Sequence, residues 1–162
     1  MSEFDRIEVL SSEEVDEIEE ECAHLPDRES AAIEALLIVQ KYRGWVSDES
    51  LYAIANLLEM SAEQLDSIAT FYNLIYRQPV GRNVVMVCDS VSCYVMGADP
   101  LKKAIERHLD VSFGETTEDG RFTLLPIVCL GACDKAPTMM INQDLIENVE
   151  AQSLAEIFGR YE

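Results

Sequence analysis

The chain has 162 residues, 48 % of them hydrophobic, and a formal net charge of −19. This length suits one ordinary domain or two small ones, and the apolar content is sufficient for a packed core. The acidic balance argues against nucleic acid or an anionic membrane as the ligand, because both are bound through clusters of Lys and Arg. A protein partner with a basic surface fits this charge better.

The sequence begins without a basic stretch followed by an apolar one, so we expect no signal peptide. Its longest apolar runs, such as 84–88, are too short to cross a bilayer. We therefore expect a soluble, cytoplasmic protein. In that reducing compartment, cysteine thiols are more often metal ligands or redox groups than members of structural disulfides.

The first half of the chain predicts short amphipathic helices. Ser11 or Ser12 can cap the first helix, acidic side chains follow in its first turn, and Pro26 ends it. The second helix is expected over about 30–43, and Gly44 suits the left-handed position that ends many helices. Its predicted apolar stripe consists of Ile33, Leu36, Leu37 and Gln40.

Two further helices follow in the same half. Ser47 can cap the third, and Ser61 with Gln64 has the spacing of a capping box for the fourth. Four short helices joined by tight turns predict a helical bundle over residues 1–78. This half carries 18 acidic and 5 basic side chains. Its aromatic last stretch, 70–79, is expected either to pack between the two halves or to contact a partner.

The second half, residues 79–162, predicts a mixture of strands and helices. The β-branched apolar run 84–88 is typical of a buried strand, and an amphipathic helix is expected over about 100–109. Asp119 and Gly120 form a hairpin-type turn. The order of the elements predicts a small α/β sandwich. Its remaining elements are strands over 121–128, 138–142 and 145–149 and a last helix over about 152–160.

Four of the five cysteines form two closely spaced pairs. Four residues separate Cys88 from Cys93, and three separate Cys129 from Cys133. Both pairs follow predicted strands, so we expect them in loops that can turn several thiolates toward one point. The fifth, Cys22, lies on the apolar side of the first helix, and we expect it to be a buried thiol.

Four thiolates suit a metal centre, and two kinds of centre compete. A structural zinc site usually has two residues between paired cysteines, which matches this spacing poorly. A [2Fe–2S] cluster needs two thiolates at each of two irons, which two separated pairs can supply. Thiol redox chemistry or inert core thiols are the remaining alternatives, although a C-x-x-C motif is absent. Small residues that would let backbone N–H groups approach the sulfurs are Ser90, Ser92, Gly131 and Ala132.

The segments VCDSVSCYVMGA and DGRFTLLPIVCLGACDKAPTMMIN resemble the small [2Fe–2S] subunit of bacterial NADH:quinone oxidoreductase, which is respiratory complex I. The segments SIATFYNLIYRQPVGRNVV and ALLIVQKYRGWVSDE also match that family. The resemblance covers the chain from about residue 10 to its end. Related subunits occur in NAD-reducing hydrogenases and NAD-dependent formate dehydrogenases, but the length and the motif detail favour the respiratory complex.

The resemblance implies an N-terminal helical bundle followed by a thioredoxin-like α/β domain that holds one [2Fe–2S] cluster. It implies that the cluster ligands are Cys88, Cys93, Cys129 and Cys133, and that this chain has no NADH or quinone site and no catalytic residue of its own. The implied partner is the subunit that binds NADH and FMN, and through it the other peripheral-arm subunits.

In that family the complex is attached to the inner membrane from the cytoplasm, and this subunit does not insert into the membrane. The cluster exchanges electrons with the FMN of the partner subunit. We expect the acidic helical half, or the aromatic stretch 70–76, to dock on that partner.

Overall fold

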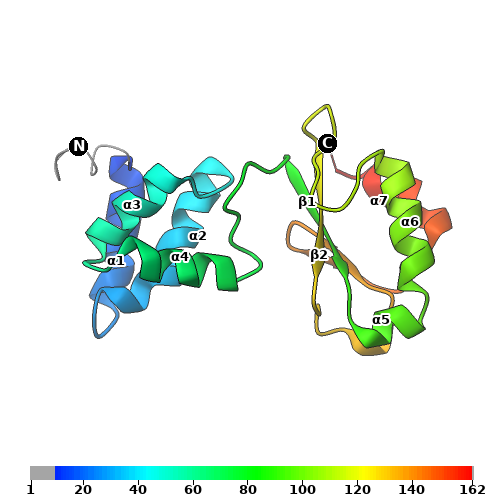
Figure 1. Ribbon diagram of the computed structural model, residues 1–162, viewed down its shortest axis with the longest axis horizontal. Coiled ribbons are helices and arrows are strands. Elements are labelled where there is room, and N and C mark those ends of the chain that lie inside the picture. The colour runs from blue at the N-terminus through cyan, green and yellow to red at the C-terminus, as the bar shows by residue number, and fades with distance from the viewer. Residues whose placement is uncertain (1–9, 162) are drawn as a thin grey trace. The chain divides into compact units, whose positions relative to one another are not determined.

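The structure is a computed structural model that describes residues 10–161 (Figure 1). The chain divides into two compact units, one ending at Pro79 and the other beginning at Val80. The first unit contains helices, and the second combines helices with a four-stranded sheet. Among the described residues, no helix has both the length and the apolar composition needed to cross a membrane.

The helix starts predicted in the first unit are confirmed, and serine side chains cap three of them. Ser11 and Ser61 form capping boxes with the side chains of Glu14 and Gln64, and Ser47 caps through its hydroxyl alone. The described elements of this unit are α1 (Ser12–Ala23), η2 (Glu29–Ala31), α2 (Ala32–Arg43), α3 (Asp48–Leu57) and α4 (Ala62–Phe71).

The buried face of α2 differs from the predicted stripe. Ala35, Leu36 and Val39 are fully buried, whereas Leu37 is 42 % exposed. Gln40 makes polar contacts with the backbone of the segment that follows α4. Apolar residues occupy most positions of this helix, so its periodicity did not single out one face.

Side chains from all four helices form one apolar core. Ile18, Leu36, Ile54 and Leu65 have no exposed surface. Burying a side chain of this size contributes roughly 1.5–3 kcal/mol to folding. Cys22 lies in the same core, so the prediction of a buried thiol is confirmed.

The second unit is built on a mixed sheet of β1 (Asn83–Cys88), β2 (Phe122–Ile127), β3 (Met139–Ile141) and β4 (Asp144–Ile146). The strand order is β2-β1-β3-β4. β1 pairs in parallel with β2 and antiparallel with β3, and β3 pairs antiparallel with β4. Because β1 and β2 are parallel, the chain leaves both strands at the same edge of the sheet.

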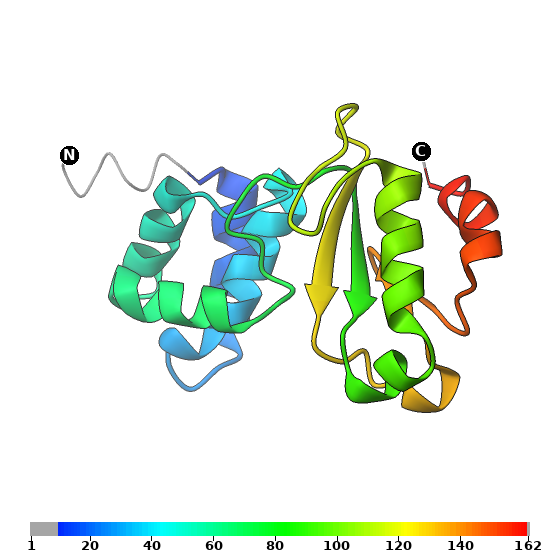
Figure 2. The ribbon, with the colours of Figure 1, turned by 45° about the vertical axis from the view of Figure 1, so that its right-hand side comes forward.

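Helices α6 (Ala98–Leu109) and α7 (Leu154–Phe158) cover one face of this sheet (Figures 1 and 2). Alternate residues of β1 enter the core beneath them, since Val85 and Val87 pack in one cluster with Leu101 and Ile105 of α6. The remaining short elements are α5 (Val91–Val95), η3 (Cys133–Lys135) and η4 (Ala151–Ser153).

The C-terminal elements are shorter than predicted. The last strand ends at Ile146, because Asn148 adopts a positive φ of 49° that an extended strand cannot include. Val149 then donates a backbone hydrogen bond to Pro137 O (2.9 Å) rather than to a strand partner. The helix expected over 152–160 is reduced to α7, preceded by the 3₁₀ turn η4.

Candidate metal centre

The end of β1 and the segment after it carry the first cysteine pair. Cys88 is the last residue of the strand, and the Asp89 N–H donates to Ile127 O (2.7 Å), which extends the parallel pairing by one step. Ser90 then caps α5, accepting the Cys93 N–H at its hydroxyl (3.5 Å). Cys88 and Cys93 are both buried, with exposed fractions of 2 % and 1 %.

The helix α5 corrects the expectation that both pairs lie in loops. Cys93 is on this helix, and its position three residues after the capping Ser90 fixes its orientation toward the interior. The serine-to-cysteine spacing is the signal that could have predicted the helix, because an N-cap side chain bonds the N–H two or three positions further on.

The loop after β2 carries the second pair. Gly131 has a positive φ of 79°, and its N–H donates to Cys129 Sγ (3.3 Å). Cys133 begins η3, and its sulfur lies 3.8 Å from that of Cys129. In a tetrahedral thiolate site with metal–sulfur bonds of about 2.3 Å, neighbouring sulfurs are about 3.8 Å apart. This pair, which is exposed, therefore has the spacing of two ligands on one ion.

Contacts between the loops bring the two pairs to one place. Burial acts to raise the pKa of the Cys88 thiol, but hydrogen bonds from Ser90, from the backbone of Leu130 and from Cys93 lower this pKa to about 7. Leu130 belongs to the second loop, so a residue between Cys129 and Cys133 contacts a sulfur of the first pair.

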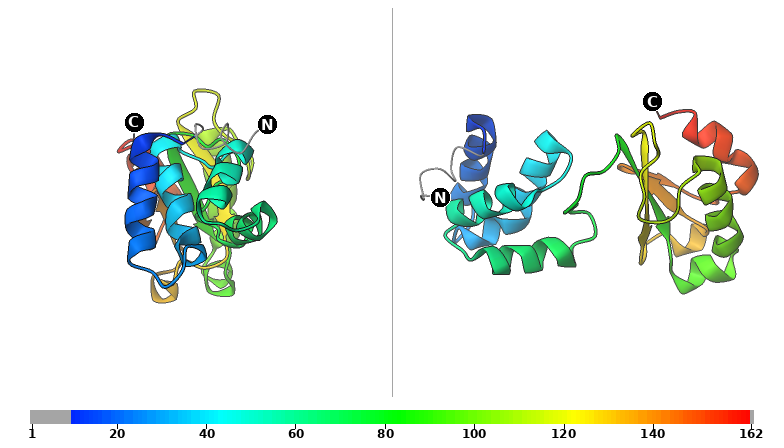
Figure 3. Two further views of the ribbon diagram at one scale, coloured as in Figure 1. Left: turned by 90° about the vertical axis from the view of Figure 1, so that its left-hand side faces the viewer. Right: turned by 45° about the horizontal axis from the view of Figure 1, so that its top comes forward.

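A residue of the first segment likewise contacts a sulfur of the second pair. A hydrogen bond with Cys129 raises the pKa of Cys133, while a hydrogen bond with Ser92, which belongs to α5, acts to lower it. Figures 2 and 3 show α5 and the turn η3 together at the same end of the sheet. All four cysteines of the two pairs thus gather where β1 and β2 end.

Thr138 contributes a buried hydroxyl to the same site. Its Oγ1 lies 3.7 Å from Cys93 Sγ, and its carbonyl oxygen accepts the Cys88 N–H (3.2 Å). Only 1 % of this residue is exposed. Sequence reasoning missed it, because a single threonine before a strand has no chemical signature.

The rim of the site is apolar, with one ion pair. Lys102 of α6 pairs with Asp89, which directly follows Cys88 in the sequence. Val91 and Val95, one turn apart on α5, are 75 % and 74 % exposed, and Val128 beside Cys129 is 73 % exposed. Exposed apolar side chains gathered in this way mark many protein interaction sites.

The donor set is compatible with a binuclear iron centre. Within residues 10–161, no three His, Cys, Asp or Glu side chains are grouped closely enough to hold one metal ion. The thiols are arranged as two pairs, one on the end of β1 and on α5 and the other in the loop after β2, and these segments contact each other. Two thiolates at each of two irons is the ligation that a [2Fe–2S] cluster requires.

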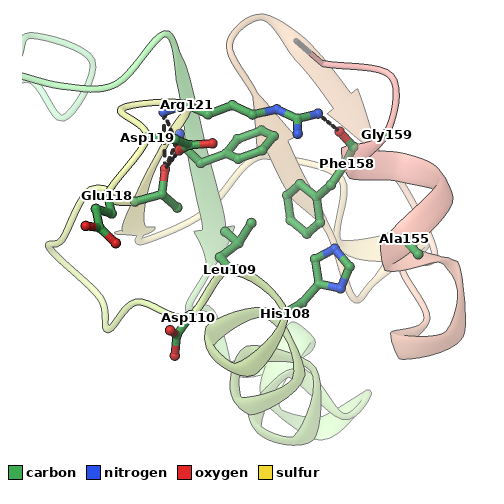
Figure 4. Close-up of a pocket in the computed structure, with 11 residues that line it drawn as sticks. His108, Leu109, Asp110, Glu118, Asp119, Arg121, Ala155, Phe158 and Gly159 are labelled. Carbon is green, nitrogen blue, oxygen red and sulfur yellow. Dashed lines mark hydrogen bonds between the residues drawn. The ribbon is translucent and has the colours of Figure 1, made fainter.

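A cavity of about 620 Å³ lies away from the cysteines, between the end of α6, α7 and the turn at 117–121 (Figure 4). Arg121 crosses it and donates to the carbonyl oxygens of Tyr161 (2.7 Å) and Phe158 (2.9 Å). His108 stacks on the Phe158 ring at a centroid distance of 5.3 Å. The arginine thus satisfies carbonyls at the C-terminal end of α7, which is a structural role.

Residues 18–162 match the family described as thioredoxin-like [2Fe-2S] ferredoxin. The chain belongs to this family. A protein of Salmonella typhimurium that is named as a subunit of NADH-quinone oxidoreductase is 49 % identical over 152 residues, which are 94 % of this chain and 92 % of the relative. A Pseudomonas aeruginosa protein of the same name is 47 % identical over 153 residues, with the same coverage of each chain. The resemblance noted in the sequence is confirmed.

The fold also has a solved counterpart. The structure of an NAD⁺-reducing [NiFe]-hydrogenase in its H₂-reduced state aligns with 80 % of this chain and 22 % of the hydrogenase chain, with a TM-score of 0.68. At 19 % identity this likeness shows a shared fold. Together with the family match, it confirms a mixed helix-and-sheet protein with a thioredoxin-like [2Fe–2S] domain.

Proposed function

We propose that the chain is the electron-transfer subunit of an NADH:quinone oxidoreductase and holds one [2Fe–2S] cluster. The proposed ligands are Cys88, Cys93, Cys129 and Cys133. The observation that carries this proposal is the gathering of two thiol pairs at one edge of the sheet, with 3.8 Å between the sulfurs of the second pair. The name shared by the near-full-length relatives supports the assignment to that complex.

Each part of the site has a role in this proposal. Cys88 and Cys93, fixed by β1 and α5, would hold one iron in the interior, and Cys129 and Cys133 would hold the other at the surface. A bound [2Fe–2S] cluster would supply reversible one-electron storage. The Gly131 N–H donates to a ligand sulfur and so offsets part of the thiolate charge.

The proposed electron partner is the FMN of a subunit that also binds NADH, through which this chain joins the other peripheral-arm subunits. The complex would be cytoplasmic and peripheral to the inner membrane. The exposed apolar rim of the site supports a protein partner there. The acidic helical unit, or the stretch 70–76, is the second proposed contact, since Phe71 and Leu74 are 77 % and 47 % exposed.

The proposed domain organisation is a helical bundle over 1–78 and a [2Fe–2S] domain over 79–162. It is supported by the division into compact units after Pro79 and by the location of all four proposed ligands in the second unit.

Co-expression with the flavin subunit should give one complex in gel filtration at low and moderate salt. Separate elution of the two chains would contradict the docking, and subunits recovered with the native assembly would distinguish a respiratory complex from a hydrogenase or a formate dehydrogenase.

The cluster itself is tested by metal analysis of the purified chain. We expect a red-brown protein with about two irons and about two acid-labile sulfides per chain. Cys129→Ala should abolish the EPR signal of the reduced protein, whereas Cys22→Ala, which changes a core thiol of the helical unit, should retain it. One zinc per chain with no sulfide would contradict this proposal. It would indicate instead a protein-interaction module whose fold is stabilised by zinc.

A further inference from the structure

The Thr138 hydroxyl is buried directly against a proposed cluster ligand. Thr138 immediately precedes β3 and is 1 % exposed, with its Oγ1 at 3.7 Å from Cys93 Sγ. In the described part of the chain, that sulfur is the one hydrogen-bonding partner of the hydroxyl. A hydroxyl buried without any partner costs about 1–3 kcal/mol, so this contact accounts for a polar group in an otherwise apolar position.

The direction of the hydrogen bond follows from the chemistry of a ligand sulfur. A metal-bound cysteine is a thiolate and has no proton to donate. The hydroxyl must therefore be the donor, with the sulfur of Cys93 as acceptor. The carbonyl oxygen of the same threonine accepts the Cys88 N–H (3.2 Å), so Thr138 contacts both members of the buried pair.

Burial makes this donor consequential. Cys129 and Cys133 are exposed, so water can donate to their sulfurs. Cys93 is 1 % exposed, and water cannot fill the same role there. A protein hydroxyl is then the means by which the charge of this sulfur is stabilised, and hydrogen bonds are stronger in such a low-dielectric setting.

We propose that Thr138 is a positioning residue that donates a hydrogen bond to the Cys93 thiolate and thereby raises the reduction potential of the cluster. The inference rests on the proposed function, because it requires a cluster bound at these four thiolates. Reduction adds one negative charge to the centre, and a donor to a ligand sulfur stabilises the reduced form more than the oxidised form. Loss of the donor should therefore lower the potential.

The test uses the intact holoprotein in an EPR-monitored redox titration. Thr138→Val has nearly the same shape and lacks the hydroxyl, and Thr138→Ser keeps the hydroxyl and lacks the methyl group. For Thr138→Val we expect about two irons per chain and a roughly fivefold smaller equilibrium constant for reduction, which is about 40 mV because a tenfold change is 59 mV for one electron. Thr138→Ser should retain the potential of the unmodified protein.

Thr123→Val is the matched control, since Thr123 is also buried and its hydroxyl accepts the Gly81 N–H (2.6 Å) rather than contacting a sulfur. It should lower stability and leave the potential unchanged. A fully loaded Thr138→Val protein with an unchanged potential would overturn the inference, as would an equal shift in Thr138→Ser. If Thr138→Val loads too little cluster, Thr138→Ala supplies the same measurement. An unmodified protein without iron and sulfide would instead overturn the proposed function.

Discussion

Glu14 at the start of α1 forms a bidentate ion pair with Arg43 at the end of α2. Nε and Nη2 of the arginine each lie 2.6 Å from a carboxylate oxygen. Glu14 is 1 % exposed, although most acidic side chains of α1 lie at the surface. One of its oxygens also accepts the Ser11 N–H (2.7 Å) in the capping box. A single carboxylate thus joins the cap of one helix to the end of the next.

Replacing that carboxylate by an amide should destabilise the protein. Glu14→Gln removes the carboxylate charge from two charge-assisted hydrogen bonds with the partly covered guanidinium of Arg43. We expect the free energy of unfolding to fall by about 2–3 kcal/mol, measured by urea denaturation followed by circular dichroism. Glu20→Gln, on the exposed side of the same helix, should change it by less than about 0.5 kcal/mol. Equal losses in the two variants would show that the pair contributes nothing specific.

The same pair predicts a pH dependence. Burial acts to raise the pKa of Glu14, but hydrogen bonds from Arg43 and from Ser11 outweigh it and place this pKa below its ordinary value. A carboxyl whose pKa is lower in the folded state stabilises the fold above its unfolded pKa, about 4.3, and loses that contribution as the pH falls through the folded value. The stability difference between the unmodified protein and Glu14→Gln should stay constant from about pH 7 to about pH 5 and shrink below about pH 4. A difference that is unchanged at about pH 3 would contradict the assignment.

The helix starts were predictable because their determinants are local. Ser11, Ser47 and Ser61 each cap the helix that follows them, and a cap depends only on residues within one turn. The buried face of α2 was not predictable, because it depends on which neighbouring helices pack against a segment that is apolar on several sides. The strand order β2-β1-β3-β4 likewise depends on pairings between distant segments, which periodicity does not encode.

The candidate site also combines features that the local sequence indicates with features that depend on tertiary packing. The spacing of the cysteines indicated two pairs, and the parallel pairing of Cys88 with Ile127 explains how those pairs reach one edge of the sheet. The sequence did not indicate that the first pair is buried and the second exposed. That asymmetry arises because α5 turns Cys93 inward, whereas Cys129 lies beyond the end of β2.

The backbone conformation of Gly131 should control how firmly the second loop holds metal. Its φ of 79° costs an ordinary residue roughly 1–2 kcal/mol, and a methyl group there would meet no described atom within 4 Å, so the penalty of Gly131→Ala is conformational. We expect iron loss to a chelator to become roughly five- to thirtyfold faster. The rate of iron loss from Gly131→Asn should lie between the rates for the unmodified protein and for Gly131→Ala, because asparagine adopts positive φ more readily than alanine does.

Gly114→Ala is the control for that measurement. Gly114 also has a positive φ, 93°, and equally open surroundings, but it lies in the loop before β2, where its N–H donates to Leu124 O. This variant should lower the stability of the fold without changing the rate of iron loss. If the two alanine variants lost iron equally fast, global unfolding rather than the second loop would limit metal retention.

The ion pair between Asp89 and Lys102 should set the local charge beside the first cysteine pair. Lys102 is the better covered partner, with 19 % of its side chain exposed against 57 % for Asp89. Removing the lysine charge leaves a carboxylate next to Cys88 and disfavours the added electron, whereas removing the carboxylate leaves a cation and favours it. Lys102→Met should therefore lower the reduction potential, and Asp89→Asn should raise it. An interaction of roughly 0.5–1 kcal/mol corresponds to about 20–40 mV for one electron.

The double variant tests whether charge is the cause. Asp89→Asn combined with Lys102→Met removes both charges and should return the potential close to that of the unmodified protein. Lys103→Met is the control, because Lys103 is at an exposed position on the same helix. It should shift the potential less than Lys102→Met does. The backbone bond from Asp89 to Ile127 is kept in every variant, so the loop retains its anchor. Removing a positive charge and removing a negative charge must shift the potential in opposite directions. Shifts of the same sign in both single variants would therefore mean that the pair acts through the conformation of the loop.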